Sequence, residues 1–147
     1  MRRALAAIAV TLLTAGCSSS PPTQHLTPSE QIGAWADGGG QKRLDALRAD
    51  QSAFVNSAGD PTGNACFQLR DDAKAARAYA PMPDTAAEQH WAASLADLET
   101  FAKDCIAATA DGPNSILWDQ ARSAMNAAQT ESSALNDRLS EIIGSHE

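Results

Sequence analysis

The chain has 147 residues, 44% of them hydrophobic, and a formal net charge of −7 at pH 7. This length suits one domain with its own hydrophobic core. The acidic balance argues against a nucleic acid or an anionic lipid surface as the electrostatic partner, because binding to either requires a basic patch. Apolar residues recur at steps of three and four positions, and alternating β-branched runs are absent from the sequence. This pattern predicts an all-α fold.

The N-terminus has the organisation of a bacterial export signal. Arg2 and Arg3 give it a positive charge, and the uncharged apolar stretch 4–13 that follows is too short to span a bilayer. The small residues Ala15 and Gly16 then suit cleavage by a signal peptidase. We therefore predict a signal peptide over residues 1–16 that is removed from the mature protein.

Residues 12–17 read Leu-Leu-Thr-Ala-Gly-Cys and resemble the lipobox of bacterial lipoproteins, although that family usually has Leu, Val or Ile in place of Thr14. The resemblance implies cleavage just before Cys17 and attachment of a diacylglycerol to its thiol. Each buried methylene group contributes about 0.8 kcal/mol, so two or three acyl chains hold a protein on the bilayer. We expect a protein anchored to the extracytoplasmic face of the cell membrane. The alternative is an ordinary secreted protein whose cysteine falls at this position by chance.

Cleavage before Cys17 leaves 131 residues, and the loss of Arg2 and Arg3 changes the net charge from −7 to −9. Residues 17–26 are mostly polar and rich in serine and proline, which predicts a flexible tether behind the lipidated cysteine. The stretch 18–25 has a reach of about 25 Å at roughly 3.1 Å per residue. The folded helical domain is expected over residues 27–147.

Five helical stretches are predicted after the tether. Thr27 and Glu30 have the spacing of a capping box, with proline at the first helical position between them. The three glycines at 38–40 are expected to break this first helix and to act as a hinge. The later stretches are separated by turn residues, and they cover residues 41–58, 64–80, 84–111 and 114–143. Short connections between them predict an antiparallel three- to four-helix bundle.

Two local pairings are expected in the fourth stretch. Thr85 and Glu88 have the spacing of a second capping box. Glu99 and Lys103 are four residues apart, in the order that favours an ion pair on a helix. The inward-facing positions of the helices are rich in alanine, which buries little area per residue. The core is therefore expected to be thin for its length and to benefit from a cross-link.

The two cysteines that remain after lipidation, Cys66 and Cys105, predict a disulfide. An even pair in an exported protein is normally oxidised. Each cysteine shares the apolar face of its helix, on the two arms of the hairpin that turns at residues 81–83. A closed loop of about 40 residues contributes on the order of 4 kcal/mol in the chain-entropy model. The alternative, two free thiols at a metal or redox site, lacks CxxC spacing and nearby histidines.

The candidate ligand or partner face consists of the three tryptophans, Trp35, Trp91 and Trp118. They could line one groove between the helices, although tryptophans on such faces are more often core residues because each buries a large apolar area. Both readings place them on the inward side of the bundle.

No catalytic residue, metal or cofactor is expected. His90 lies near a helix start, but a metal site would need a second histidine one turn away or a Glu-x-x-His motif, and the sequence offers neither. We therefore expect His90 to be a solvated surface residue. Ser132 could be a nucleophile only beside a base. Its hydroxyl is expected to bond a backbone carbonyl one turn back.

The sequence from Cys66 to Asp111 resembles small alanine-rich exported proteins of actinobacteria, which share the paired cysteines, a Pro-x-Pro turn and a tryptophan-bearing helix. The resemblance implies no activity, and a phage-encoded envelope lipoprotein acting on the host surface remains open. We expect a non-enzymatic envelope lipoprotein whose helical module presents a face to a protein or cell-wall partner. The alternative is a carrier that binds a small apolar ligand between the helices. A cavity of several hundred Å³ would favour the carrier, and a solid core with an exposed apolar patch would favour the partner-binding module.

Overall fold

The computed structural model describes residues 26–56, 64–113 and 115–144. These residues form five α-helices and one π-helical turn and contain no β-strand, which confirms the predicted all-α fold. The elements are α1 (Pro28–Trp35), the π-helical turn η1 (Ala36–Gly40), α2 (Gln41–Asn56), α3 (Asn64–Arg77), α4 (Thr85–Asp111) and α5 (Leu117–Gly144). The predicted signal peptide, Cys17 and most of the predicted tether lie outside the described residues.

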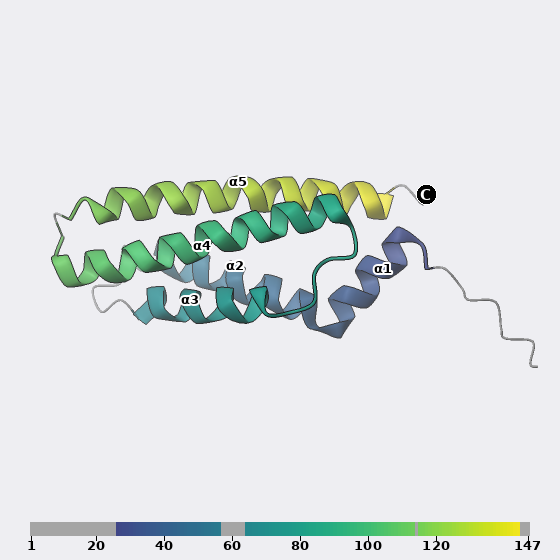
Figure 1. The fold of residues 1–147 in the computed structure, drawn as a ribbon, viewed down its shortest axis with the longest axis horizontal. Helices are drawn as coiled ribbons and strands as arrows, with labels where there is room; N and C mark the ends of the chain where they lie inside the picture. The colour runs from purple at the N-terminus through teal and green to yellow at the C-terminus, as the bar shows by residue number, and fades with distance from the viewer. Residues whose placement is uncertain (1–25, 57–63, 114, 145–147) are drawn as a thin grey trace, which may run out of the picture.

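Four of these helices form an antiparallel bundle around α4. The two long helices α4 and α5 run side by side in opposite directions, α3 packs on α4, and α2 packs on α3 (Figure 1). The short α1 leaves the bundle at an angle, and its first turn approaches the C-terminal end of α5 (Figure 1). The predicted three- to four-helix bundle is therefore confirmed with four helices, to which α1 adds a separate arm.

The start of α1 and its glycine-rich end follow the sequence signals. The side chain of Thr27 accepts the Glu30 N–H at 3.3 Å, and the Glu30 carboxylate accepts the Thr27 N–H at 2.7 Å, so the capping box is confirmed. At the other end Gly39 has a φ of 121°, which favours glycine, and the chain kinks there. The break falls where it was predicted: Gly39 is non-helical, and α1 and α2 are two helices joined across a kink within η1. A Cβ at Gly40 would overlap the indole of Trp35, so that position requires glycine.

Small side chains and the cysteine pair let α3 and α4 pack closely. The Sγ atoms of Cys66 and Cys105 lie at disulfide-bonding distance, as predicted, and their Cα atoms are 6.0 Å apart. Both cysteines are fully buried. The other residues buried on these two helices include both leucines and alanines. Among them are Leu69, Ala73, Ala76, Leu98, Ala102 and Ala108. The thin alanine-rich core expected from the sequence is therefore present, with the cross-link inside it.

The start of α4 differs from the prediction. Asp84 is the N-cap, and its carboxylate accepts the Ala87 N–H at 2.9 Å. The Glu88 carboxylate accepts the N–H of Met82 at 2.7 Å, six residues earlier in the chain. The capping box predicted between Thr85 and Glu88 is therefore wrong. With Asp84 already capping the helix, Glu88 is left to hold the segment that precedes it.

Two arginines form ion pairs with acidic residues on or next to another helix. Arg77 Nε donates to the Glu99 carboxylate at 2.7 Å, between α3 and α4. The ion pair predicted between Glu99 and Lys103 is wrong, because Glu99 turns toward the neighbouring helix. Arg138 on α5 donates to both carboxylate oxygens of Asp84, at 3.1 Å and 2.9 Å. This bidentate contact fixes the start of α4 against α5.

Candidate functional site

The segment between α3 and α4 is the most irregular part of the bundle. Eleven residues of α3 follow Cys66, whereas twenty residues of α4 precede Cys105. Because the cysteines hold the two helices at the same height, α4 begins about 13 Å beyond the end of α3. Residues 78–84 cover this offset and run beside the first turns of α4 (Figure 1).

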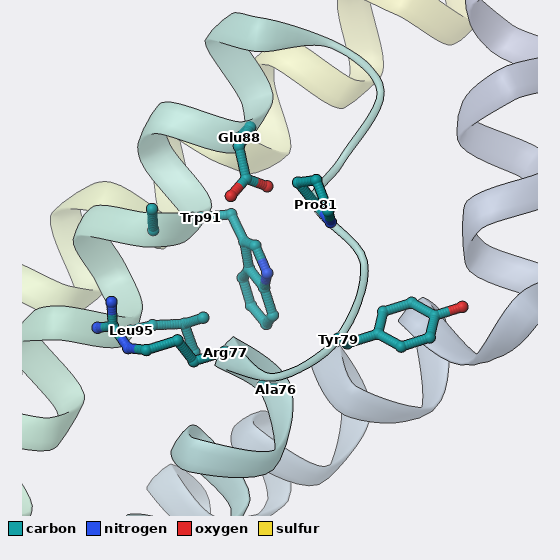
Figure 2. A pocket seen from close by; sticks show the side chains of 8 residues that line it. Ala76, Arg77, Tyr79, Pro81, Glu88, Trp91 and Leu95 are labelled. Atoms are coloured by element: carbon teal, nitrogen blue, oxygen red, sulfur yellow. The ribbon is translucent and has the colours of Figure 1, made fainter.

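A cavity of about 170 Å³ opens between this segment and α4, and we call it the Trp91 pocket. Its lining residues are Ala76, Arg77, Tyr79, Pro81, Glu88, Trp91, Ala92 and Leu95. Figure 2 shows the indole of Trp91 at its centre, with the Glu88 carboxylate at one end and Arg77 at the other. The hydroxyl of Tyr79 points away from Trp91 in this view. The pocket is therefore an aromatic and aliphatic hollow with one charged group at each end.

The wall of the pocket is held by contacts from outside it. Trp35 on α1 donates its indole N–H to the carbonyl of Ala80 at 2.8 Å. The N–H of Met82 donates to Glu88 at 2.7 Å, so the segment is fixed on both sides of the pocket's Pro81. The Trp35 ring also meets the Trp91 ring edge to face, with centroids 6.3 Å apart and planes at 83°. These contacts preorganise the pocket.

The two charged groups of the pocket differ in their partners. The Arg77 guanidinium is balanced by Glu99 at 2.7 Å. Among the ion pairs of the described part of the chain, none involves Glu88. One oxygen of Glu88 accepts the Met82 N–H, and the other has no hydrogen-bond partner there. The uncompensated charge at the pocket is therefore negative.

The three tryptophans do not form one face. Trp35 and Trp91 are brought together at the pocket, and both are buried. Trp118 lies in the first turn of α5, where its indole N–H donates to the Gly112 carbonyl at 3.2 Å. Twenty residues of α4 separate Trp91 from the far end of that helix, a length of about 30 Å. The interpretation in which Trp118 joins Trp35 and Trp91 in one groove is therefore wrong.

A layer of polar residues joins α4 to α5 next to the pocket. His90 Nδ1 lies 2.8 Å from a carboxylate oxygen of Glu131, and the His90 side chain is 38% exposed. The sequence gives no sign of this partner, because 41 residues separate the two positions and no local pattern relates them. His90 is a surface residue, as expected, and it also forms a contact between the two helices.

Two serines continue this layer inward. The Ser94 and Ser132 hydroxyls are 3.0 Å apart, and Ser94 donates to the carbonyl of Ala128 at 3.3 Å. Ser132 was expected to donate to the carbonyl one turn before it, which is that of Ala128. Ser94 of the neighbouring helix donates to this carbonyl instead. Ser94 is buried, and neither serine bonds His90 in the described hydrogen-bond network. The layer thus lacks the nucleophile–base contact of acyl-transfer enzymes.

A second hollow, of about 450 Å³, lies between α2 and α5. Its lining residues are Arg48, Gln51, Ser52, Val55 and Gln129. Arg48 donates to the Asn136 side chain at 2.8 Å across this interface. This hollow is wide open to solvent, so it does not enclose a ligand as the cavity of a carrier would.

Comparison with known proteins adds no relative to this description. No family model, curated protein or solved structure matches the chain. In residues 26–56, 64–113 and 115–144, no helix has the length and apolar character needed to cross a bilayer. The same residues contain no cluster of three or more histidine, cysteine or acidic side chains suited to hold a metal ion.

Two carboxyl groups have shifted pKa values of opposite sign. Burial, together with the neighbouring Asp72 carboxyl, raises the pKa of Asp50 from 3.8 to about 6. The hydrogen bonds from Arg138, followed by the Ala87 N–H, lower the pKa of Asp84 from 3.8 to about 2. The folded state therefore favours protonated Asp50 and ionised Asp84.

These shifts predict a stability maximum in mildly acidic solution. The contribution of Asp50 is fully present below pH 3.8 and is lost as the pH rises through 6, whereas that of Asp84 is present above pH 3.8 and is lost as the pH falls toward 2. We expect the melting temperature to be higher at pH 5 than at pH 7.5. Asp50→Asn should raise it at pH 7.5 and flatten this slope. The exposed Asp45→Asn should leave the slope unchanged, and an equal slope in all three proteins would contradict the assignment.

Proposed function

We propose that the protein is a lipid-anchored envelope protein, held in the membrane through Cys17, whose helical domain binds a partner protein or cell-wall component through the Trp91 pocket. In this proposal the protein is not an enzyme, and its role is to hold a partner near the extracytoplasmic face of the membrane. The observation that carries the proposal is the size and setting of the pocket.

The volume of the pocket favours a protruding side chain as its occupant. One water molecule takes about 30 Å³ in the liquid, so 170 Å³ corresponds to about six waters. Sites for small ligands are usually about 300–1,000 Å³ and enclose most of the ligand. A preorganised hollow below that range is better suited to anchor one residue of a larger partner. This comparison supports the partner-binding module over the carrier of an apolar ligand.

The proposed anchor is consistent with the direction of the chain at the N-terminal end of the bundle. Leu26 is the first described residue and is nine positions from Cys17. The start of α1 and the C-terminal end of α5 lie at the same end of the molecule (Figure 1). A tether leaving from Leu26 would place this end toward the membrane and the α4–α5 turn away from it.

The anchor predicts a simple fractionation result. Wild-type protein should be recovered with the membranes, and mass spectrometry of its N-terminal peptide should find acyl chains on Cys17, since two or three chains make desorption negligible. Cys17→Ala should release the protein from the membrane fraction or leave the signal peptide uncleaved. A mature protein whose Cys17 carries no lipid would refute the anchor.

Filling the pocket tests the partner-binding role. Ala92→Phe places a large ring in the lining, and Ala96→Phe places the same ring one turn later on the exposed side of α4. We expect chemical cross-linking in intact cells to yield the same partner with wild type and Ala96→Phe and to lose it with Ala92→Phe. Equal melting temperatures would show that both variants are folded. Retention of the partner by Ala92→Phe would rule out the pocket as its docking site.

A further inference from the structure

We propose that the Trp91 pocket receives a basic side chain, a lysine or arginine of the partner, whose alkyl part lies on the indole and whose charged end meets Glu88. This inference rests on the proposed function, because it names the group that the docking site recognises. It is carried by three features of the pocket: the uncompensated carboxylate, the indole surface and the small volume.

The carboxylate sets the sign of the occupant. Glu88 and Arg77 are the charged residues of the lining, and Arg77 is already balanced by Glu99 at 2.7 Å. One oxygen of Glu88 is engaged by the Met82 N–H, which fixes the orientation of the group and leaves the other oxygen as an acceptor. A cationic donor complements this arrangement, whereas a carboxylate would meet like charge. The mature domain carries a net charge of −9, which adds long-range attraction for a basic partner.

The indole and the aliphatic residues set the shape of the occupant. Lysine and arginine bury their methylene groups on apolar surface while the charged head stays near polar groups. In the pocket, Pro81, Trp91 and Leu95 supply that surface, and Glu88 lies at one end of the indole (Figure 2). The nearby face of Tyr79 is already occupied, since the Arg43 guanidinium lies 4.0 Å from its ring centroid. Trp91 is therefore the aromatic residue of the lining that has no cation on its ring, and the partner meets the 5% of its surface that is exposed.

The experiment compares short peptides that differ in one central residue. A Gly-Gly-Lys-Gly-Gly peptide, its arginine analogue, and the norleucine and glutamate analogues would be titrated into the mature protein while the indole N–H signal of Trp91 is followed by NMR. We expect the lysine and arginine peptides to shift this signal saturably. The norleucine peptide, which keeps the alkyl chain and lacks the charge, should bind about two- to fivefold more weakly. The glutamate peptide should not bind.

Two charge-neutralising variants locate the interaction. Glu88→Gln keeps an acceptor for the Met82 N–H and should lower the affinity for the lysine peptide about two- to fivefold, with no change for norleucine. Asp97→Asn removes the same charge from α4 outside the pocket and should leave both affinities unchanged. Equal binding of lysine and norleucine, or equal effects of the two variants, would overturn the basic-side-chain inference and leave the docking role intact. Failure of the lysine and arginine peptides to shift Trp91 would also overturn the inference. The docking role falls only if Ala92→Phe retains the partner.

Discussion

Opening the Cys66–Cys105 bond is expected to lower the free energy of unfolding by about 4 kcal/mol. The cysteines are 39 residues apart, and the loss of loop entropy in the unfolded chain gives this magnitude. Domains of this size are stable by only about 5–15 kcal/mol, so the bond accounts for a large share of the total. The residues around the bond are mostly alanine and leucine. The alanines bury little apolar area, so their packing offsets little of the stability lost when the bond opens.

The measurements are urea unfolding and thermal unfolding of the oxidised protein, the reduced protein and the double variant Cys66→Ala/Cys105→Ala. Both the reduced protein and the double variant should melt roughly 10–20 °C lower than the oxidised protein. Thiol titration of the denatured, delipidated and unreduced protein provides the control, because a formed bond leaves neither cysteine reactive. Two reactive thiols in that titration, or unfolding free energies within about 1 kcal/mol of each other, would contradict the expectation.

The sequence predicts the buried faces of the helices that bury a single apolar stripe. Leu69 and Ala73 on α3, and Met125 and Leu135 on α5, fall on apolar stripes with steps of three and four, and all four are buried. Such a stripe is a local property of the chain, because helix geometry alone brings its members to one face. The cysteine pairing was supported by stripes of the same kind, since Cys66 lies on the apolar stripe of α3 and Cys105 on that of α4.

The Trp91 pocket could not be predicted in the same way. It exists because α4 begins about 13 Å beyond the end of α3, and that offset depends on how two helices dock. The sequence predicts a turn at residues 81–83 between the two arms. The sequence does not indicate that the turn runs beside α4. Nor does it indicate that the Ala80 carbonyl accepts a hydrogen bond from Trp35 or that Glu88 accepts one from the Met82 N–H.

The cap of α4 illustrates the same limit in a single position. Both Asp84 and Thr85 are residue types that cap helices well, so sequence preference alone left the choice open. The structure selects Asp84, which also receives two hydrogen bonds from Arg138, 54 residues away. His90 and Glu131 are also far apart in the sequence, and no local pattern predicts their contact.

The central position of α4 produced the main omission from the predicted core. Trp91 and Cys105 were expected on the inward side of this helix, whereas Phe101, which is fully buried, was not named. A helix with neighbours on several sides buries more than one stripe, and the sequence did not indicate how α2 lies in the bundle. In the structure Phe54 of α2 reaches α4, and its ring meets that of Phe101 edge to face at 4.7 Å between centroids.

Phe101→Ala is therefore expected to lower the free energy of unfolding by about 3–5 kcal/mol, the usual cost of removing a fully buried phenylalanine. The cost combines lost apolar burial, the cavity that remains and the lost contact with Phe54. Phe67→Ala is the matched control, because that ring is 41% exposed on α3 and should cost well under half as much. Urea unfolding of both variants and of wild type gives the comparison.

A double-mutant cycle separates the ring contact from burial. Phe54→Ala alone should cost less than Phe101→Ala, because Phe54 is only partly buried. The double variant should be less destabilised than the sum of the single variants by about 0.5–1.5 kcal/mol, the range for edge-to-face aromatic pairs. Strict additivity would show that the rings contribute only through the area they bury. A cost for Phe101→Ala no larger than that for Phe67→Ala would contradict the placement of α2 beside α4, because without that helix the Phe101 ring would lie at the surface.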